Sequence, residues 1–213
     1  MLRPQRREQL LAAATGIVRS SGIEALTMAA LAEQAGVSKP VVYEHFSNSE
    51  EVALALLDRY FVEIVKCVQA RTQSAETLDD YISLAIDAEF DFHSDGALSI
   101  RSITNGHTSS HATGDKLNAA FLRIREQANG TFRDLLEQQG VSRDVATVSG
   151  FVLSEMLNST VPEYAANDAG GLARETLKVM MLATIHAVCP KPMARPHTPE
   201  WIIEEARRTI EHD

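Results

Sequence analysis

The chain has 213 residues, of which 45% are hydrophobic and 23% charged, so it can fill a sizeable core and is not an unfolded or fibrous polypeptide. No apolar run approaches the roughly 20 residues that cross a bilayer, and the first residues lack the apolar stretch of a secretion signal. We therefore expect a cytoplasmic protein that makes no use of a membrane.

The net charge of −9 argues at first against a polyanionic partner, but the charge is unevenly distributed. Residues 1–47 carry five Lys or Arg and four Glu, a net +1, which leaves −10 for the remainder. Such an acidic body would repel a duplex. Any contact with DNA is therefore expected at the N-terminal end, where Arg3, Arg6 and Arg7 lie.

The two cysteines, Cys67 and Cys189, stand singly in apolar helical patterns and lack the close spacing of metal ligands. They are predicted to be reduced core residues. A redox-sensing thiol is the alternative, and it would require an exposed cysteine.

Apolar residues at helical spacing dominate the N-terminal part, and alternating β-branched patterns are nearly absent. Thr27 and Ser38 are predicted N-caps, and Gly36 interrupts a helix. The predicted helices are a first one that contains Leu10 to Val18 and ends at Gly22, a second over 28–35, a third from Ser38 to about Phe46, and a long fourth one from Ser47 through Val68.

The rest of the chain is predicted to be helical as well. Gly140 closes one helix, and Pro162 ends or kinks another. The predicted helices cover about 77–93, 98–103, 116–139, 143–161 and 171–188, with a loop at 105–114, a proline-rich link at 190–199 and a short terminal helix that contains Trp201. The fold class is therefore all-α.

The most specific pattern is the segment 27–46, TMAALAEQAGVSKPVVYEHF. Leu31 and Ala32 are expected to pack inward, and Gly36 lets the backbone reverse. Val37 and Val42 then fill the angle between two helices. This pattern is typical of a helix-turn-helix.

The outer face of the third helix would be free to enter a major groove, since it combines hydrogen-bonding and apolar groups. Thr27 and Ser38, at helix starts, can offer hydroxyl and N–H groups to phosphates. The residues on the outer face are Lys39, Pro40, Val41, Tyr43, Glu44 and His45.

Helical periodicity alone would also fit a three-helix subdomain that binds no DNA. The cap, the Gly-Val-Ser turn and the Tyr-x-His-Phe ending occur together, which favours the helix-turn-helix. The residues that form the wider pattern are Arg6-Arg7-Glu8-Gln9-Leu10-Leu11, Ala13-Ala14, Gly22, Leu26-Thr27, Leu31-Ala32, Ala35-Gly36-Val37-Ser38 and Tyr43-Glu44-His45-Phe46.

With these residues the chain resembles the TetR family of transcriptional regulators over roughly residues 4–64. The resemblance implies a helix-turn-helix DNA-binding domain over 4–64 and a helical effector-binding and dimerisation domain over 65–213. It also implies that Lys39, Pro40 and Val41 face bases, while Tyr43, His45 and the Thr27 helix start grip phosphates.

The chain departs from the family pattern at two places. The family commonly has a lysine in the position of Ser49, where it meets a phosphate, but here Glu50 and Glu51 follow a serine. Glu44 is acidic on a groove-facing helix, so it either accepts from a cytosine amine or pairs with Lys or Arg.

A recognition helix reads only a few base pairs, so a two-fold homodimer on a palindromic operator is expected. The helices over 143–161 and 171–188 are apolar on more than one face, as a partner contact requires. The family resemblance implies a repressor that a small-molecule effector releases from DNA. The alternative is a small-molecule-binding protein of the same fold with lost or weak DNA binding.

The resemblance also implies an effector cavity in the body, though no motif gives its position. The expected effector is small and apolar or aromatic, and anionic in the case that Arg125 faces inward. Plain core packing is the alternative for each candidate. The candidates are Phe61, Val65, Phe90, His93, Ile103, Phe121, Arg125, Phe151 and Met156.

Catalysis and metal binding are not expected. His93, His107 and His111, with Asp91 and Asp95, could be imagined as a metal site, but the surrounding Gly and Ser indicate a loop with solvated histidines. The sequence has no phosphate-binding glycine loop, no nucleophile elbow and no zinc-protease motif, so neither an enzyme nor a cofactor is predicted.

Overall fold

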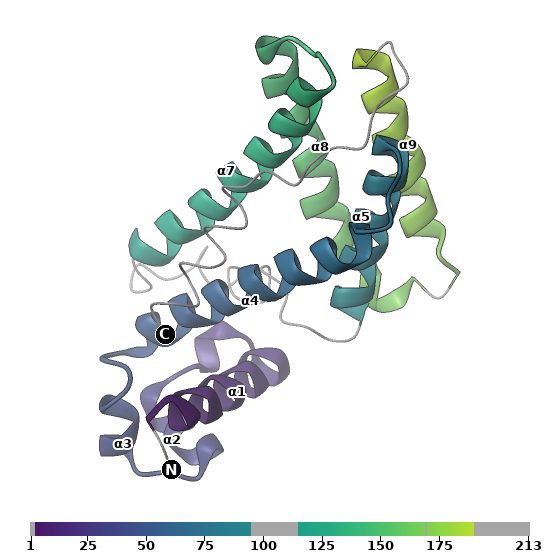
Figure 1. The fold of residues 1–213 in the computed structure, drawn as a ribbon. Coiled ribbons are helices and arrows are strands. Elements are labelled where there is room, and N and C mark those ends of the chain that lie inside the picture. Colours follow the sequence, from purple (N-terminus) through teal and green to yellow (C-terminus); the bar gives the residue numbers. More distant parts are fainter. Residues whose placement is uncertain (1–2, 95–114, 169, 190–213) are drawn as a thin grey trace. The chain divides into compact units, whose positions relative to one another are not determined.

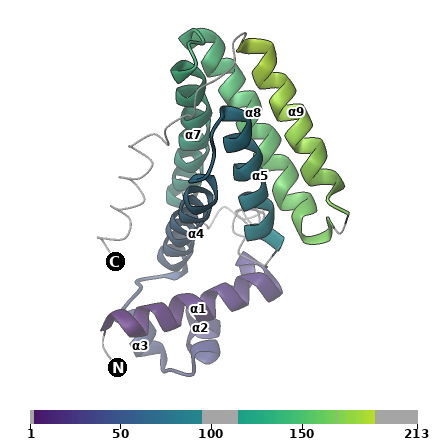
Figure 2. The ribbon, with the colours of Figure 1, turned by 45° about the vertical axis from the view of Figure 1, so that its right-hand side comes forward.

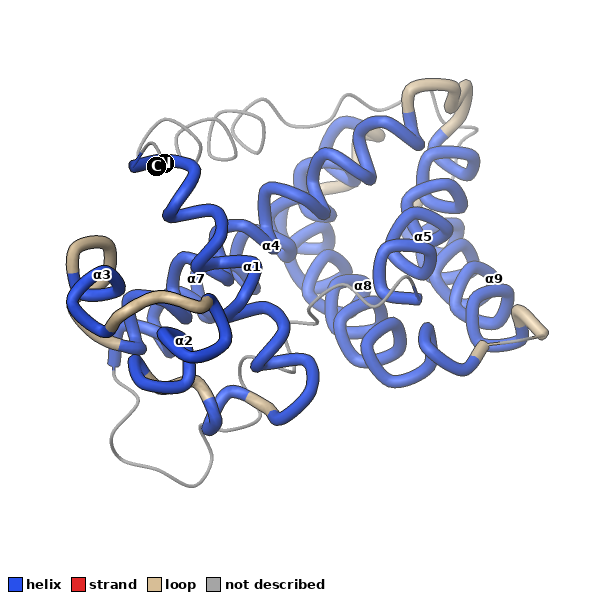
Figure 3. The backbone as a smooth tube through the Cα atoms, turned by 90° about the horizontal axis from the view of Figure 1, so that it is seen from below, coloured by secondary structure: helices blue, strands red, loops and turns tan. Residues whose placement is uncertain are grey.

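The computed structural model describes residues 3–94, 115–168 and 170–189. Within these ranges the chain is helical and contains no strand, which confirms the all-α fold class (Figure 3). The elements are α1 (Arg3–Ser21), η1 (Ile23–Ala25), α2 (Met28–Ala35), α3 (Lys39–Tyr43), α4 (Ser49–Thr72), α5 (Leu78–Ser94), α7 (Asp115–Gln138), α8 (Arg143–Tyr164), η2 (Ala165–Asn167) and α9 (Leu172–Val188).

The segments predicted as a helix over 98–103, a loop over 105–114, a proline-rich link and a terminal helix lie outside the described residues. No helix of the described ranges is both long enough and apolar enough to span a membrane. The chain divides into two compact units. We call the described residues 3–61 and 115–122 the N-terminal unit, and the described residues 62–94, 123–168 and 170–189 the C-terminal unit.

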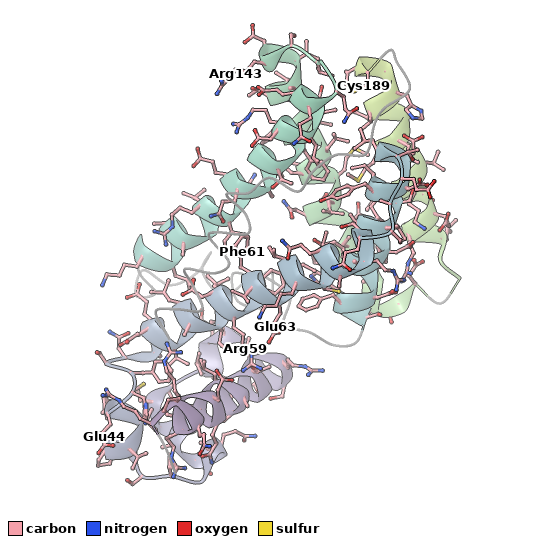
Figure 4. All side chains as sticks on the ribbon, viewed as in Figure 1. Glu44, Arg59, Phe61, Glu63, Arg143 and Cys189 are labelled. Atoms are coloured by element: carbon pink, nitrogen blue, oxygen red, sulfur yellow. The ribbon has the colours of Figure 1, made fainter. Side chains whose placement is uncertain are left out.

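The N-terminal unit is built on α1, which packs against α2 (Figures 1 and 2). Its core is leucine-rich: Leu10, Leu31 and Leu56 are fully buried on three different helices. Arg59 of α4, labelled in Figure 4, places Nη1 3.1 Å from the Glu8 carboxylate of α1. Apolar burial therefore holds the helices together, and this half-exposed ion pair adds little.

In the C-terminal unit α5, α8 and α9 contact one another, and η2 contacts α5 and α8. Phe90, Leu153 and Met181 come from three of these helices and are completely buried in one cluster. The helix predicted to end or kink at Pro162 continues to Tyr164. The Ala165 N–H bonds the Val161 carbonyl, which closes that end of α8.

A band of charged side chains crosses α5 and α9 beside this core. Arg174 Nη2 lies 2.7 Å from Asp91, and Lys178 Nζ lies 2.8 Å from Asp87. Arg71, near the end of α4, also reaches Asp91 at 2.9 Å. The Lys178 and Asp87 side chains are only 15% and 19% exposed, so their pairing matters more than that of a fully solvated pair.

Gly150 marks a very close approach between α7 and α8. A Cβ at this position would lie 2.8 Å from the Arg133 backbone nitrogen and 3.0 Å from the Asn129 carbonyl oxygen. Ser154, one turn later on α8, donates its hydroxyl to the Asn129 side chain. The two backbones can approach this closely only because Gly150 has no side chain.

Gly150→Ala is expected to destabilise the protein by about 1–3 kcal/mol, because the methyl group must push apart two helix backbones. Chemical denaturation monitored by circular dichroism measures the change. Gly16→Ala in α1 is the matched control, since its Cβ would meet only the end of the Gln34 side chain at 3.7 Å. Helix propensity should make that control neutral or slightly stabilising, so equal behaviour of the two variants would contradict the close contact.

Candidate nucleic-acid interface

Caps at both ends of α2 and a tight turn lead the chain into α3. The Thr27 hydroxyl accepts the Ala30 N–H at 3.1 Å and begins α2. Gly36 ends that helix in the left-handed conformation, with φ 65° and ψ 35°, where a side chain would be strained. Its N–H bonds the Ala32 and Glu33 carbonyls, and the chain then reverses into α3.

The turn at the start of α3 differs from the prediction in one detail. Ser38 is the N-cap, but its side chain makes no capping hydrogen bond. Pro40 lies at the second helical position and has no N–H to donate. Backbone hydrogen bonds begin the helix instead: the Ser38 carbonyl accepts the N–H groups of Val41 and Val42.

Two buried side chains fix the orientation of α3. Val42 is fully buried and Phe46 is 1% exposed, so the opposite face of the segment must point outward. Tyr43 is 55% exposed, although it is a large aromatic residue. The segment thus brings the predicted base-facing and phosphate-facing residues to one exposed surface, with Ser38, Lys39, Pro40, Tyr43 and Glu44 exposed and Val41 and His45 half-buried.

The start of α4 explains one acidic departure from the family pattern. The Asn48 side chain accepts the Glu51 N–H at 2.9 Å, and the Glu51 carboxylate accepts the Ser47 N–H at 2.6 Å. This reciprocal pair is a capping arrangement. Glu51 therefore has a structural role at the helix start, and neither bond involves the side chain of Ser49.

A cleft of about 590 Å³ lies between the first turns of α1 and the α3 segment, and sequence reasoning did not assign it. Its lining consists of Arg3, Arg6, Val41, Glu44 and His45. The charge count pointed to these arginines, but only the packing of α1 brings them beside His45. Gln9 helps to fix that packing, because its amide donates to the Ala35 carbonyl of α2 at 2.9 Å.

The cleft has a positive electrostatic character. Arg7 lies beside it, with its guanidinium 5.0 Å from the centre of the Phe46 ring. Partial burial lowers the pKa of His45, and the positive charges of Arg3, Arg6 and Arg7 lower it further, against the opposing effect of Glu44. His45 is therefore neutral at pH 7. Glu44, which directly follows α3 and is labelled in Figure 4, makes no ion pair with any other described side chain.

The candidate effector residues are not all in comparable environments. Phe90 and His93 on α5 are buried, and Met156 on α8 packs against the same core cluster as Phe90. Phe61 and Val65 on α4 are half-buried. Ile103 and the side chain of Phe121 lie outside what the structure describes.

Two other candidates face away from an apolar interior. Phe151 is 49% exposed, on the same outer side of α8 as Val148 and Val152. Arg125 donates to Glu155 at 2.6 Å, so a neighbouring carboxylate already balances its charge. His107 and His111 lie outside the described residues, and those that are described contain no cluster of His, Cys, Asp and Glu suited to a metal.

The buried His93 and the half-buried Glu89 form a polar pair one helical turn apart on α5. The His93 Nδ1 lies 2.8 Å from the Glu89 carbonyl oxygen and 3.7 Å from its carboxylate. Burial lowers the pKa of His93, which the bond to the Glu89 carbonyl partly offsets, and burial raises the pKa of Glu89 to about 8. Near neutral pH both side chains are therefore mainly uncharged.

Glu89→Gln is expected to reduce the pH dependence of stability. The folded protein holds the Glu89 proton up to about pH 8, while the unfolded chain releases it near 4.5. The wild type should therefore lose about 2 kcal/mol of unfolding free energy between pH 6 and pH 8, and the variant should lose less. Urea denaturation at both pH values measures this, with the exposed Glu126→Gln as control. Parallel pH profiles for wild type and Glu89→Gln would refute the assignment.

Comparison with known proteins supports a common fold and family. Residues 10–56 match the model of the bacterial regulatory proteins of the tetR family. The chain is 39% identical over 90 residues to the HTH-type transcriptional activator FasR of Mycolicibacterium smegmatis. This alignment covers 42% of this chain and 41% of FasR. It is 28% identical over 140 residues to the HTH-type transcriptional regulator CymR of Pseudomonas putida, and this alignment covers 65% of this chain and 68% of CymR.

Solved structures of similar fold extend over nearly the whole chain. SCO4454, a TetR-family transcriptional regulator from Streptomyces coelicolor, superposes with a TM-score of 0.72 at 22% identity, over 87% of this chain and 97% of that one. AibR, solved with isovaleryl coenzyme A and operator DNA, superposes with a TM-score of 0.61 at 20% identity, over 88% of this chain and 100% of AibR.

The N-terminal unit carries a helix-turn-helix with an exposed second helix, and residues 10–56 within it match the tetR family of bacterial regulatory proteins. The family match, the relatives and the shared fold together support a transcription regulator of the TetR type.

Proposed function

We propose that the protein binds a palindromic operator as a homodimer and that a small molecule controls this binding. Residues 4–64 would form the DNA-binding domain, and residues 65–213 the effector-binding and dimerisation domain. The observation that carries the proposal is the exposed face of α3, held outward by the buried Val42 and Phe46. Since the proposed partner is chromosomal DNA, we expect the protein to act in the cytoplasm.

On this face Lys39, Pro40 and Val41 would contact base edges, and Tyr43 with His45 would contact phosphates. A lysine can donate to guanine, and the proline and valine can meet a thymine methyl group. The N-terminal ends of α2 and α3, with Thr27 and Ser38, would add hydroxyl and N–H groups toward phosphates.

Selection of genomic fragments bound by the purified protein tests DNA binding and yields the operator. We expect one enriched sequence with two inverted half-sites about 34–36 Å apart or a multiple of that distance. Affinity for it should fall steeply with salt, as phosphate contacts require. Weak binding without sequence preference would instead favour a ligand-binding protein of the same fold that has lost DNA recognition.

The homodimer is proposed from the outer faces of α8 and α9. Both helices bury one side in the core of the C-terminal unit and leave large apolar side chains in solvent on the other. Exposed apolar faces of this kind are typical of subunit contacts. The side chains are Val145, Val148, Phe151 and Val152 of α8 and Leu172, Val179 and Met180 of α9.

The effector is proposed to be small, uncharged and apolar or aromatic. The Arg125–Glu155 pair removes the charge that would have favoured an anion. AibR, whose structure contains isovaleryl coenzyme A together with operator DNA, supports control by a small molecule in this fold but not the uncharged class, since coenzyme A carries phosphates. Repression with release by the effector is our working assignment, while the related FasR carries the name of an activator.

A thermal-shift screen with neutral aromatic, anionic and cationic compounds tests the effector class. Neutral aromatic or acyl compounds should raise the melting temperature, because a ligand that binds only the folded state stabilises it. Stabilisation by cations alone would contradict the assignment. Addition of a hit to the operator complex then shows whether the ligand releases the protein, as a repressor requires, or strengthens its binding.

A further inference from the structure

The arginine-lined cleft between α1 and the α3 segment lies on the surface that would face DNA. Three of its five lining residues, Val41, Glu44 and His45, belong to the α3 segment or directly follow it. A duplex bound by the exposed face of α3 would therefore pass along the cleft. This inference rests on the proposed function and deepens it.

The donors in the cleft have the chemistry of a phosphate site. A guanidinium carries five N–H donors in a planar fork that matches phosphate oxygens. Arg6 uses Nη1 to donate to Gln9 at 2.6 Å, which holds the side chain in place and leaves further donors for a ligand. Arg3 has a long contact of 3.4 Å to the Glu44 carbonyl oxygen, which a phosphate could readily replace.

The charges in the cleft favour an anion. Arg3 and Arg6 line it, Arg7 lies beside it, and Glu44 is the one carboxylate of its lining. After partial burial, which is the largest cause, the charges of Arg3, Arg6 and Arg7 also lower the pKa of His45, against the opposing effect of Glu44.

We propose that this cleft binds one backbone phosphate of the operator, with Arg3 and Arg6 as ionic donors and His45 as a third donor. The phosphate would place a negative charge beside His45 and raise its pKa, so DNA binding would take up part of a proton. Affinity should therefore increase as the pH falls from 8 to 6. The gain in affinity is absent above the pKa that His45 has in the DNA complex, and it is complete below the pKa that His45 has in the free protein.

The first test is the salt dependence of operator binding by the full-length protein, measured by fluorescence anisotropy. Arg3→Gln with Arg6→Gln should weaken binding about tenfold to a hundredfold at 0.15 M salt. The slope of log K against log salt should become shallower by about 2, as expected for one lost phosphate contact in each subunit of the dimer. The preferred sequence should not change, because phosphates carry no sequence information.

Arg19→Gln is the matched control for charge. Arg19 is exposed near the other end of α1 and lies outside the cleft. It should be compared with the single variants Arg3→Gln and Arg6→Gln. If all three single variants weaken binding equally, the effect is one of overall charge and the phosphate site is wrong.

The second test is the pH dependence of the same titration. His45→Gln keeps a neutral donor but cannot be protonated, so it should abolish most of the increase in affinity between pH 8 and pH 6. His186→Gln, which removes an exposed histidine paired with Asp79 on α5, should leave that increase unchanged. NMR should show a higher pKa for the His45 ring in the operator complex than in the free protein.

A third arm separates a DNA phosphate from a free anion. Inorganic phosphate at millimolar concentration, without DNA, should shift the His45 resonances only weakly. A strong shift with inorganic phosphate, together with unchanged operator affinity in the arginine variants, would overturn the proposal and assign a free-anion site. Failure of the wild-type protein to bind any operator would overturn the proposed function as well, whereas normal wild-type binding with inert arginine variants would overturn only this inference.

Discussion

Replacement of both Lys39 and Tyr43 by alanine should lower operator affinity by at least about a hundredfold. Lys39 would lose a base-edge hydrogen bond, for which about 1–3 kcal/mol of discrimination is typical, and Tyr43 a phosphate contact. In a dimer both contacts are lost in each of the two subunits. Both side chains are exposed and neither contributes to the core, so the fold and its melting temperature should change little.

A matched pair of substitutions makes this experiment specific. Lys116→Ala with Tyr164→Ala removes the same two residue types from other helices, and Tyr164 is 54% exposed, almost the same as Tyr43. This control should bind the operator like the wild type. If the Lys39 and Tyr43 variant keeps full affinity while it remains folded, α3 is not the recognition helix.

Val148→Asp combined with Val179→Asp should convert the protein from a dimer to a monomer at micromolar concentration. The two valines are 66% and 67% exposed and come from α8 and α9. In a dimer that buries both helices, the pair of substitutions would desolvate four carboxylates, each at a cost of several kcal/mol. Sedimentation velocity measures the change in mass directly.

The same variant should lose at least about two orders of magnitude in operator affinity, because a monomer cannot engage both half-sites at once. Leu122→Asp is the control: Leu122 is 60% exposed, but it lies on α7. That substitution should leave the mass unchanged. A Val148 and Val179 variant that still sediments as a dimer would move the interface to another surface.

The helix-turn-helix could be predicted almost completely because its determinants are local. A hydroxyl at Thr27, a glycine at position 36 and buried residues such as Leu31 are each readable from a few neighbouring residues. The main difference is the length of α3, which ends at Tyr43 instead of near Phe46. Helix-type backbone bonds nevertheless continue to Phe46, since the Glu44 N–H bonds the Pro40 carbonyl and the Phe46 N–H bonds the Val42 carbonyl.

The phosphate-facing surface could be predicted only in part, because it depends on tertiary packing. The sequence places Arg3 and Arg6 near the N-terminal end, but no periodicity shows that they meet His45 across 40 residues of chain. The helix periodicity likewise predicted that α8 has two apolar sides. Only burial shows that Phe151, a candidate for the effector site, belongs to the outer side.

The cap at the start of α4 has a consequence for how the strength of this regulator can change over evolution. The hydrogen bonds of Asn48 and Glu51 cap the helix without the side chain of Ser49. Position 49 can therefore gain or lose a basic residue while the helix start stays intact. In the proposed operator complex, one such substitution would add or remove a phosphate contact and so shift the fraction of operator occupied at a given cellular concentration, without a change in the preferred sequence.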